Sequence, residues 1–232
     1  MKIGIICAME EEIRTLLTKL DSDQVTEVAG NTFHQGQIGK QEVTLVQSGI
    51  GKVQAAMTTA IMLDRWDLDV VINTGSAGGI GQGLHIGDVV ISDGVGYHDV
   101  DVTGSGYLPG QLPGQPQIFT ADPHFVAEIA AAAKEVGLPA HVGLIVSGDQ
   151  FIAGAAESQK ILKCYPQALA SEMEGAAIGQ VATQFKVPFV VIRAMSDVGD
   201  ADAEVNFDDF VVEAGKKSAA MVLAFLKQAD HE

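Results

Sequence analysis

Short apolar runs alternate with segments of helical periodicity along this chain of 232 residues, and no other feature of the sequence restricts the fold as strongly. The runs that have the length of buried strands are 2–7, 43–47, 70–73, 89–92, 141–147, 168–171 and 188–195. The segments with helical patterns are 13–20, 52–64, 123–136, 174–185 and 209–226. Because alternating strands and helices place helices on both faces of one sheet, the sequence predicts a three-layer α/β/α sandwich.

The connections add detail to this α/β fold class. Stretches 25–29 and 32–38 flank the turn signal Gly30-Asn31, which predicts a β-hairpin and therefore a central sheet that is mixed and twisted. Residues 104–116 contain four glycines and three prolines, so we expect a long loop there, and such a loop in a compact domain is more often functional than a plain connector. No repeat or linker divides the chain, which predicts a single domain over 1–232.

Charge and composition exclude several classes of function. The net charge of -16, from 30 acidic and 14 basic residues, repels phosphate backbones and anionic lipids, so we expect neither nucleic acid nor a membrane as partner. The sequence lacks a signal peptide and any apolar run of about 18 residues, and we expect a cytoplasmic protein. Cys7 and Cys164 have no metal-site spacing and are predicted to be small core residues.

Polar residues follow most of the apolar runs, and ligands of open α/β sheets bind at the carboxyl ends of strands. These polar stations are 9–12, 48–52, 75–79, 147–152, 172–174 and 196–197. Four of the stations contain an acidic residue: 9–12, 147–152, 172–174 and 196–197.

The NTGSAGG motif at 73–79 is interpreted as a strand followed by a glycine-rich turn, in which backbone N–H groups and a Ser hydroxyl could hold a polar ligand. A purely structural turn fits the motif equally well. It matches neither the phosphate-binding G-x-x-x-x-G-K-[ST] pattern nor the dinucleotide-binding G-x-G-x-x-G pattern, so the sequence gives no support for ATP or a dinucleotide cofactor.

Two further stations carry candidate catalytic carboxylates. Glu172 and Glu174 are two residues apart and share one face of an extended strand, although Glu174 could also serve only to cap the helix that follows it. Asp197 follows a long apolar run, where burial would raise its pKa as an acid catalyst requires, although it too could be a helix cap with Arg193 as its structural partner. The histidines fall in no pattern that indicates a nucleophilic triad.

Taken in order, the motifs MEEE, SGIGK, NTGSAGG, SGDQFI, SEMEG and RAMSD resemble one family closely. That family is the bacterial 5′-methylthioadenosine/S-adenosylhomocysteine nucleosidases, of the purine nucleoside phosphorylase superfamily. The resemblance implies a nucleoside phosphorylase-like fold and hydrolysis of the bond between adenine and ribose in both nucleosides, and in 5′-deoxyadenosine. It also implies a place in methionine salvage and the activated methyl cycle, with neither cofactor nor metal.

The resemblance implies a role for each carboxylate. Glu12 should activate a water, Asp197 should protonate N7 of adenine, and Glu174 should hold the ribose diol with the backbone of Met173. An acid on the leaving group and a base across the ring would invert the anomeric carbon. The other residues that the resemblance places around the substrate are Met9, Ile50, Ser76, Gly78, Phe151, Ile152, Arg193, Ser196 and Phe207.

In this family the loop that matches 102–113 reaches into the site of the neighbouring subunit. The resemblance therefore implies a homodimer in which Val102, Tyr107 and Pro113 contact the substrate of the other subunit. The sequence departs from the family pattern at Ser105, where an aromatic residue is common, and at Cys7, where glycine is frequent. Tyr107 is the side chain available to compensate for Ser105.

Three alternative functions follow from the same residues. A nucleoside phosphorylase would need cations for phosphate, but the chain has only three arginines, and Arg14 and Arg65 are expected on helices, which favours hydrolysis. A hydrolase for another purine nucleoside, such as futalosine, is the second alternative. A non-catalytic nucleoside-binding protein is the third, and the joint presence of Glu12, Glu174 and Asp197 argues against it.

Overall fold

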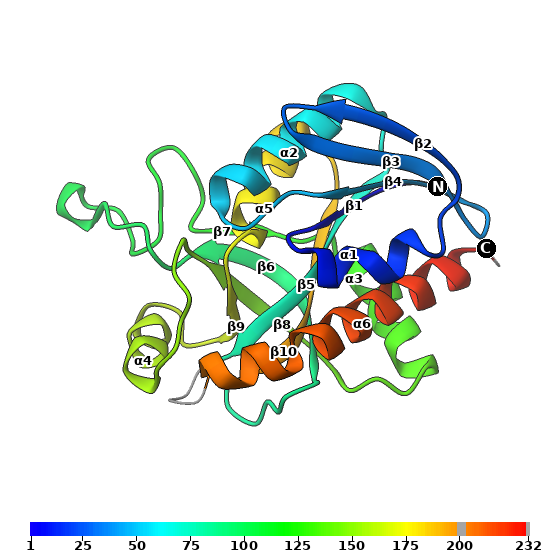
Figure 1. Ribbon diagram of the computed structural model, residues 1–232. Coiled ribbons are helices and arrows are strands. Elements are labelled where there is room, and N and C mark those ends of the chain that lie inside the picture. The colour runs from blue at the N-terminus through cyan, green and yellow to red at the C-terminus, as the bar shows by residue number, and fades with distance from the viewer. Residues whose placement is uncertain (199–202, 231–232) are drawn as a thin grey trace.

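The computed structural model describes residues 1–198 and 203–230, and a mixed sheet of ten strands runs through its centre (Figure 1). The strands are β1 (Lys2–Cys7), β2 (Asp21–Val28), β3 (Asn31–Ile38), β4 (Gln41–Gln47), β5 (Val70–Gly79), β6 (Val89–Tyr97), β7 (Ile118–Thr120), β8 (Ala140–Ser147), β9 (Ala168–Glu172) and β10 (Phe189–Asp197). The helices are α1 (Glu10–Leu17), α2 (Lys52–Arg65), α3 (Pro123–Glu135), α4 (Ala155–Cys164), α5 (Gly175–Phe185), α6 (Ala203–Ala229) and the short 3-10 helix η1 (Thr103–Ser105). The predicted α/β class is confirmed.

Five of the strands close into a ring, because β10 pairs with β5 as well as with β6. The ring runs β5-β10-β6-β8-β9 and returns to β5, and from β5 the sheet continues through β1, β4, β3 and β2. The predicted hairpin is confirmed as the antiparallel pair β2–β3. Its two-residue turn consists of Ala29 and Gly30, both with positive φ, which is the geometry that matches the twist of hairpin strands.

Helices cover both faces of the sheet and bury two separate apolar clusters. One cluster contains side chains of α1, α3 and α6, and the other contains side chains of α2 and α5 (Figure 1). Strand β1 shows how the sequence serves both: Ile3, Ile5 and Cys7 belong to the first cluster, while Ile6 belongs to the second. The predicted three-layer arrangement is therefore confirmed.

Parallel pairing brings the ends of the site-bearing strands together. Strands β1, β5 and β10 run parallel, so their carboxyl ends lie at one edge. Strand β9 runs antiparallel to β5, but its residue Ser171 pairs with Gly78, which brings Glu172 to the same edge. The fold thus gathers the stations that follow these four strands.

Some local predictions were wrong or incomplete. The helix α4 and the strand β7 were not predicted, and Cys164 is exposed at the end of α4, whereas Cys7 is buried as expected. The β5 strand continues to Gly79, so the NTGSAGG motif is a strand and not a turn. Within the described ranges, no helix is long and apolar enough to cross a membrane.

Candidate active site

A cavity of about 340 Å3 opens where β1, β5, β9 and β10 end. The predicted site residues that line it are Met9, Glu12, Ile50, Ser76, Gly78, Phe151, Ile152, Met173, Glu174, Arg193, Ser196, Asp197 and Phe207. The lining residues outside the predicted set are Ala8, Ala77, Gln150, Ser171 and Glu172. One cavity therefore joins six sequence motifs that lie far apart along the chain.

Glu12 is held by four hydrogen bonds although it is almost fully buried. Its Oε2 accepts the N–H groups of Ala8 at 2.9 Å and Met9 at 3.1 Å, which serves the N-terminus of its own helix, α1. Its Oε1 accepts the N–H of Ser76 at 2.9 Å and the Ser76 hydroxyl at 3.0 Å. These donors fix the carboxylate at the cavity wall between α1 and β5.

The glycines of the NTGSAGG motif allow carboxylates to approach the β5 backbone closely. A Cβ at Gly75 would overlap Oε1 of Glu12 and Nη1 of Arg193, and a Cβ at Gly78 would lie 2.8 Å from Oδ1 of Asp197. Neither glycine has a positive φ. The motif therefore needs glycine for close packing and not for a turn, because any side chain would displace the charged groups of the site.

Asp197 lies at an irregularity in the last strand. The pairing register of β10 with β5 shifts between Met195 and Asp197, and bulges of this kind re-aim side chains beside active sites. Asp197 is 1% exposed, and the hydroxyl of Ser196 donates to its Oδ2 at 3.0 Å. The bulge thus turns two consecutive residues, Ser196 and Asp197, into the same cavity.

Arg193 is a fully buried cation at the floor of the cavity. Its Nη2 forms ion pairs with Glu172 and with Glu174, the latter at 3.2 Å, and it donates to Oδ1 of Asn73 at 2.7 Å. Its Nη1 donates to the carbonyl of Ser76 at 3.3 Å. The guanidinium therefore links β5, β9 and the start of α5, and its charge offsets the burial of two carboxylates.

Glu172 has a structural function that sequence reasoning did not identify. It accepts the N–H groups of Glu174 at 3.0 Å and Gly175 at 2.8 Å, and so caps helix α5. It also accepts the hydroxyl of Ser147 and the guanidinium of Arg193. The only signal in the sequence is its position two residues before Glu174, because its other partners lie more than 20 residues away.

Because Glu172 caps α5, the side chain of Glu174 does not serve as the helix cap that the sequence also allowed. It is the N-cap residue of α5, but its side chain makes no capping bond to that helix. Its Oε1 instead accepts the N–H of Gly51 at 2.8 Å, and its Oε2 meets Arg193. Burial raises the pKa of Glu174 to about 7, with the neighbouring Glu172 adding to the rise and Arg193 opposing it.

This raised pKa predicts a loss of stability as the pH rises. Between pH 4.5 and about 7 the unfolded chain releases the Glu174 proton while the folded protein retains it, so the free energy of unfolding should fall as pH rises. In Glu174→Gln, we expect the free energy of unfolding to fall by about 1 to 3 kcal/mol less over this pH range than in the wild type. Urea unfolding of both proteins from pH 4.5 to 8 measures the difference, and parallel curves would show that Glu174 does not titrate in this range.

Apolar side chains form the outer part of the cavity. Phe151 and Phe207 meet edge to face with ring centroids 5.5 Å apart, and both line the cavity with Ile50 and Ile152. Phe151 and Ile50 remain 44% and 55% exposed. Flat apolar walls above a charged floor suit a ligand that joins a planar ring to a polar group.

Carboxyl groups outnumber cations in the lining of the cavity. Among the described lining residues, the carboxylates are Glu12, Glu172, Glu174 and Asp197, and the one cation is Arg193. Such a site stabilises positive charge that develops on a bound molecule. Within residues 1–198 and 203–230, no group of His, Cys, Asp and Glu side chains is arranged to hold a metal ion.

Three predicted site residues lie outside the cavity of their own chain. Val102, Tyr107 and Pro113 belong to the loop between β6 and β7, which projects away from the body of the molecule (Figure 1). The base of the loop is fixed, because Gly110 N–H donates to the Val100 carbonyl at 2.9 Å. The long loop predicted at this position is confirmed apart from the turn of η1.

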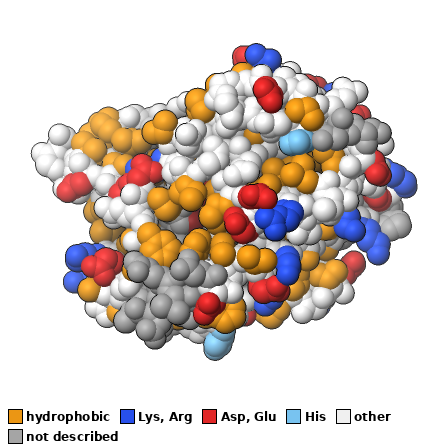
Figure 2. Space-filling model, viewed as in Figure 1, with side chains coloured by type: hydrophobic (Ala, Val, Ile, Leu, Met, Phe, Trp, Pro, Cys, Tyr) orange, Lys and Arg blue, Asp and Glu red, His pale blue; other side chains and the backbone are white. Residues whose placement is uncertain are grey.

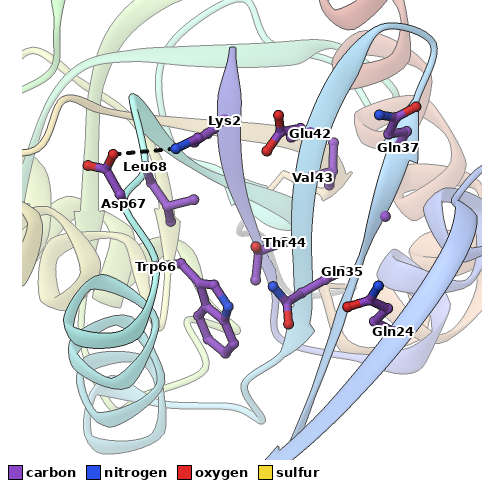
Figure 3. A pocket seen from close by; sticks show the side chains of 11 residues that line it. Lys2, Gln24, Gln35, Gln37, Glu42, Val43, Thr44, Trp66, Asp67 and Leu68 are labelled. Atoms are coloured by element: carbon purple, nitrogen blue, oxygen red, sulfur yellow. Dashed lines mark hydrogen bonds and ion pairs between the residues drawn. The ribbon is translucent and has the colours of Figure 1, made fainter.

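A second cavity, of about 460 Å3, lies at the amino end of β1, opposite the end that carries the first cavity. Trp66 and several glutamine side chains line it, and the ion pair between Lys2 and Asp67 spans its rim at 3.4 Å (Figure 3). Both partners of that pair are exposed. Glu42 and Asp67 are the carboxylates among its described lining residues and both are exposed, whereas the buried carboxylates line the first cavity.

Comparisons with known proteins identify close relatives. Residues 2–227 match the family model of the phosphorylase superfamily. The S-adenosylhomocysteine nucleosidase of Streptococcus pyogenes, solved with 5-methylthiotubericidin, is 48% identical over 98% of this chain and 97% of that one, with a TM-score of 0.95.

Two further structures are similar over nearly their whole length. The 5′-methylthioadenosine/S-adenosylhomocysteine nucleosidase of Streptococcus pneumoniae, solved with the transition-state inhibitor MT-ImmA, is 50% identical over 98% of this chain and 99% of that one, with a TM-score of 0.94. The corresponding nucleosidase of Colwellia psychrerythraea, solved with adenine, is 45% identical over 98% and 95%, with a TM-score of 0.95.

Proposed function

The chain belongs to the 5′-methylthioadenosine/S-adenosylhomocysteine nucleosidases of the phosphorylase superfamily, and from this we propose that it hydrolyses the N-glycosidic bond of these nucleosides to release adenine and the 5′-thio-substituted ribose. The observation that carries the proposal is a single cavity in which apolar walls stand above four carboxylates. Adenine fits between such walls, and the carboxylates suit the bond that has to break.

Asp197 acts on the leaving group in this proposal. Adenine leaves poorly as an anion, so a proton must reach its N7 as the bond to ribose breaks. Asp197 is buried, ends at the cavity, and has its carboxylate oriented by the Ser196 hydroxyl. As a protonated acid it donates to N7 and becomes the carboxylate.

Glu12 acts on the water. Its carboxylate takes a proton from a water that attacks the anomeric carbon as adenine departs, and the Ser76 hydroxyl that it accepts holds it in place. With acid and base on opposite sides of the sugar, the reaction inverts the anomeric carbon.

Glu174 binds the ribose, and Arg193 holds Glu174 in place. Carboxylates accept hydrogen bonds from a diol, and Glu174 faces the cavity from the start of α5. As the bond breaks, the ribosyl group becomes cationic, and the surrounding carboxylates stabilise that charge. Arg193 keeps Glu172 and Glu174 in position through its two ion pairs.

Water is the nucleophile in preference to phosphate. A phosphate site needs several cations or free backbone N–H donors, and Arg193 is the one cation among the described lining residues, already bound to two carboxylates. Even with Asp197 protonated, the carboxylates of Glu12 and Glu172 would repel a dianion from the same space. This favours a hydrolase over a phosphorylase.

The test is incubation of the purified protein with 5′-methylthioadenosine, with and without phosphate, and chromatography of the products. We expect adenine and free methylthioribose at a rate that phosphate does not change. A sugar phosphate would mean a phosphorylase, and binding without release of adenine would mean a nucleoside-binding protein. S-adenosylhomocysteine and futalosine in parallel reactions define the accepted nucleoside.

We further propose a homodimer in which the projecting loop reaches the cavity of the other subunit. The cavity is open near Ile50 and Phe151, and exposed apolar side chains are present on α2, at Val53, and on the projecting loop, at Leu108. Hydrophobic side chains gather at the end of the molecule that carries the loop (Figure 2). Tyr107 and Pro113 would then close over a substrate held by a second copy.

Mixing two defective variants tests the shared site. Asp197→Asn protein and Tyr107→Ala/Pro113→Ala protein should each be impaired alone, but after subunit exchange the mixture should recover activity, because one cavity of each mixed dimer is intact. The matched control mixes Asp197→Asn with Glu12→Gln, which leaves no intact cavity and should not recover. A monomer in sedimentation analysis, or no recovery in the first mixture, would contradict the crossing loop.

A further inference from the structure

The N-terminus of α2 is bound by carboxylates from two other segments. Gly51 is its N-cap residue and has no side chain to cap the helix. Glu174 Oε1 instead accepts the N–H of Gly51, and Asp149 Oδ1 accepts the N–H of Lys52, both at 2.8 Å. Both carboxylates lie at the positive end of the helix dipole, which favours them there.

The side chain of Lys52 extends this contact into a small network. Its Nζ lies 2.5 Å from Oδ2 of Asp99, 3.7 Å from Oδ2 of Asp149, and 5.5 Å from the centre of the Tyr97 ring. The N–H of Asp149 donates to the same Asp99 oxygen at 2.9 Å. We call Lys52, Asp99 and Asp149 the Lys52 network.

The Lys52 network favours the ionised form of Asp99. Burial alone would raise the pKa of Asp99, but the hydrogen bonds from Lys52 and from the Asp149 backbone hold it below its usual value. Its other oxygen, Oδ1, is buried and accepts no hydrogen bond within the described residues. Burying such a half-satisfied carboxylate costs free energy, so the arrangement is a poor way to gain stability alone.

Each member of the Lys52 network stands beside a segment of the proposed site without lining the cavity itself. Ile50 precedes Lys52 by two residues, and Phe151 and Ile152 follow Asp149. Asp99 begins the segment that leads into the projecting loop. The ammonium group therefore joins the ribose side and the adenine side of the cavity to the base of the loop.

We propose that Lys52 is a positioning residue for the nucleoside: through Asp99 and Asp149 it fixes the distance between the segment of Ile50 and Gly51, which reaches Glu174, and the segment of Phe151 and Ile152, which forms the adenine wall. The inference rests on the proposed function for the identity of the substrate. It gives the exposed Phe151 a fixed support, because the segment that carries it belongs to a coil between β8 and α4.

Substitution of Lys52 tests this role. Lys52→Met keeps most of the length of the side chain and removes the charge. We expect it to raise the KM for 5′-methylthioadenosine and the dissociation constant of adenine by about tenfold each, with a smaller change in kcat. Lys52→Arg should restore most of the affinity. Asp99→Asn should have a similar effect, and the double variant Lys52→Met/Asp99→Asn should be little worse than either single one.

The control is Asp67→Asn, which breaks the exposed pair with Lys2 just beyond the far end of α2 and should change neither constant. Unchanged adenine affinity in folded Lys52→Met and Asp99→Asn proteins, with only a lower melting temperature, would overturn the inference in favour of a purely structural ion pair. Calorimetry with adenine needs no turnover. A wild-type protein that binds adenine but releases none from the substrate would therefore refute the proposed function while the Lys52 network is still tested.

Discussion

Asp197→Asn is expected to lower kcat for adenine release by about 100- to 10,000-fold, the range that one proton transfer contributes. Asparagine keeps the shape and can still meet the Ser196 hydroxyl, but it has no acidic proton to give to N7. Binding of 5′-methylthioadenosine should change little, because the apolar walls and the ribose-binding groups are intact. Single-turnover rates and calorimetric binding measure the two effects separately.

The leaving group distinguishes an acid from a residue that merely binds. A 5′-thioribosyl compound whose leaving group departs without protonation, such as a nitrophenolate, should react with the Asp197→Asn protein almost as fast as with the wild type. Wild-type rates of adenine release in the variant would remove Asp197 from the mechanism. Equal losses with both leaving groups would also exclude the acid role and indicate a structural defect at the β10 bulge.

Much of the candidate site could be predicted because its residues follow apolar strands directly. Glu12 lies just beyond β1, Glu174 just beyond β9, and Asp197 ends β10, so an argument from strand ends places all three at one edge of the sheet. The choice of Glu12 within its station and the role of each carboxylate came from the family resemblance. The different functions of Glu172, which caps α5, and Glu174, which faces the cavity, could not be predicted. It depends on Arg193 and Ser147, which reach Glu172 only in the folded sheet.

The helices and strands could largely be predicted from the sequence, but the closure of five strands into a ring could not. The hydrophobic pattern of β1 and of β10 specifies buried strands, yet the pairing of β10 with both β5 and β6 joins segments about 100 residues apart and leaves no local signal. The strand character of NTGSAGG was missed for a related reason. Its glycines make room for Glu12 and Asp197, which are far away in the sequence, and they do not form a local turn.

Glu12→Gln is expected to lower kcat by a similar factor of about 100- to 10,000-fold, but for a different reason. Glutamine cannot take a proton from water. Its NH2 group must also face either the N–H groups of Ala8 and Met9 or the N–H of Ser76, all of which donate hydrogen bonds to the carboxylate of Glu12. The mismatch should also cost about 1 to 3 kcal/mol of stability. Adenine binding and the melting temperature, measured on the same preparation, show that the variant is folded.

The same nitrophenolate compound distinguishes the function of Glu12 from that of Asp197. A better leaving group should not rescue Glu12→Gln, because the step that lacks its catalyst is the activation of water and not the departure of the base. Glu12→Asp, which keeps a carboxylate one methylene shorter, should recover part of the rate if a water can still lie between it and the sugar. Rescue of Glu12→Gln by the leaving group would instead mean that water attacks after the slow step, and that Glu12 chiefly stabilises the cationic ribosyl group from the end of β1.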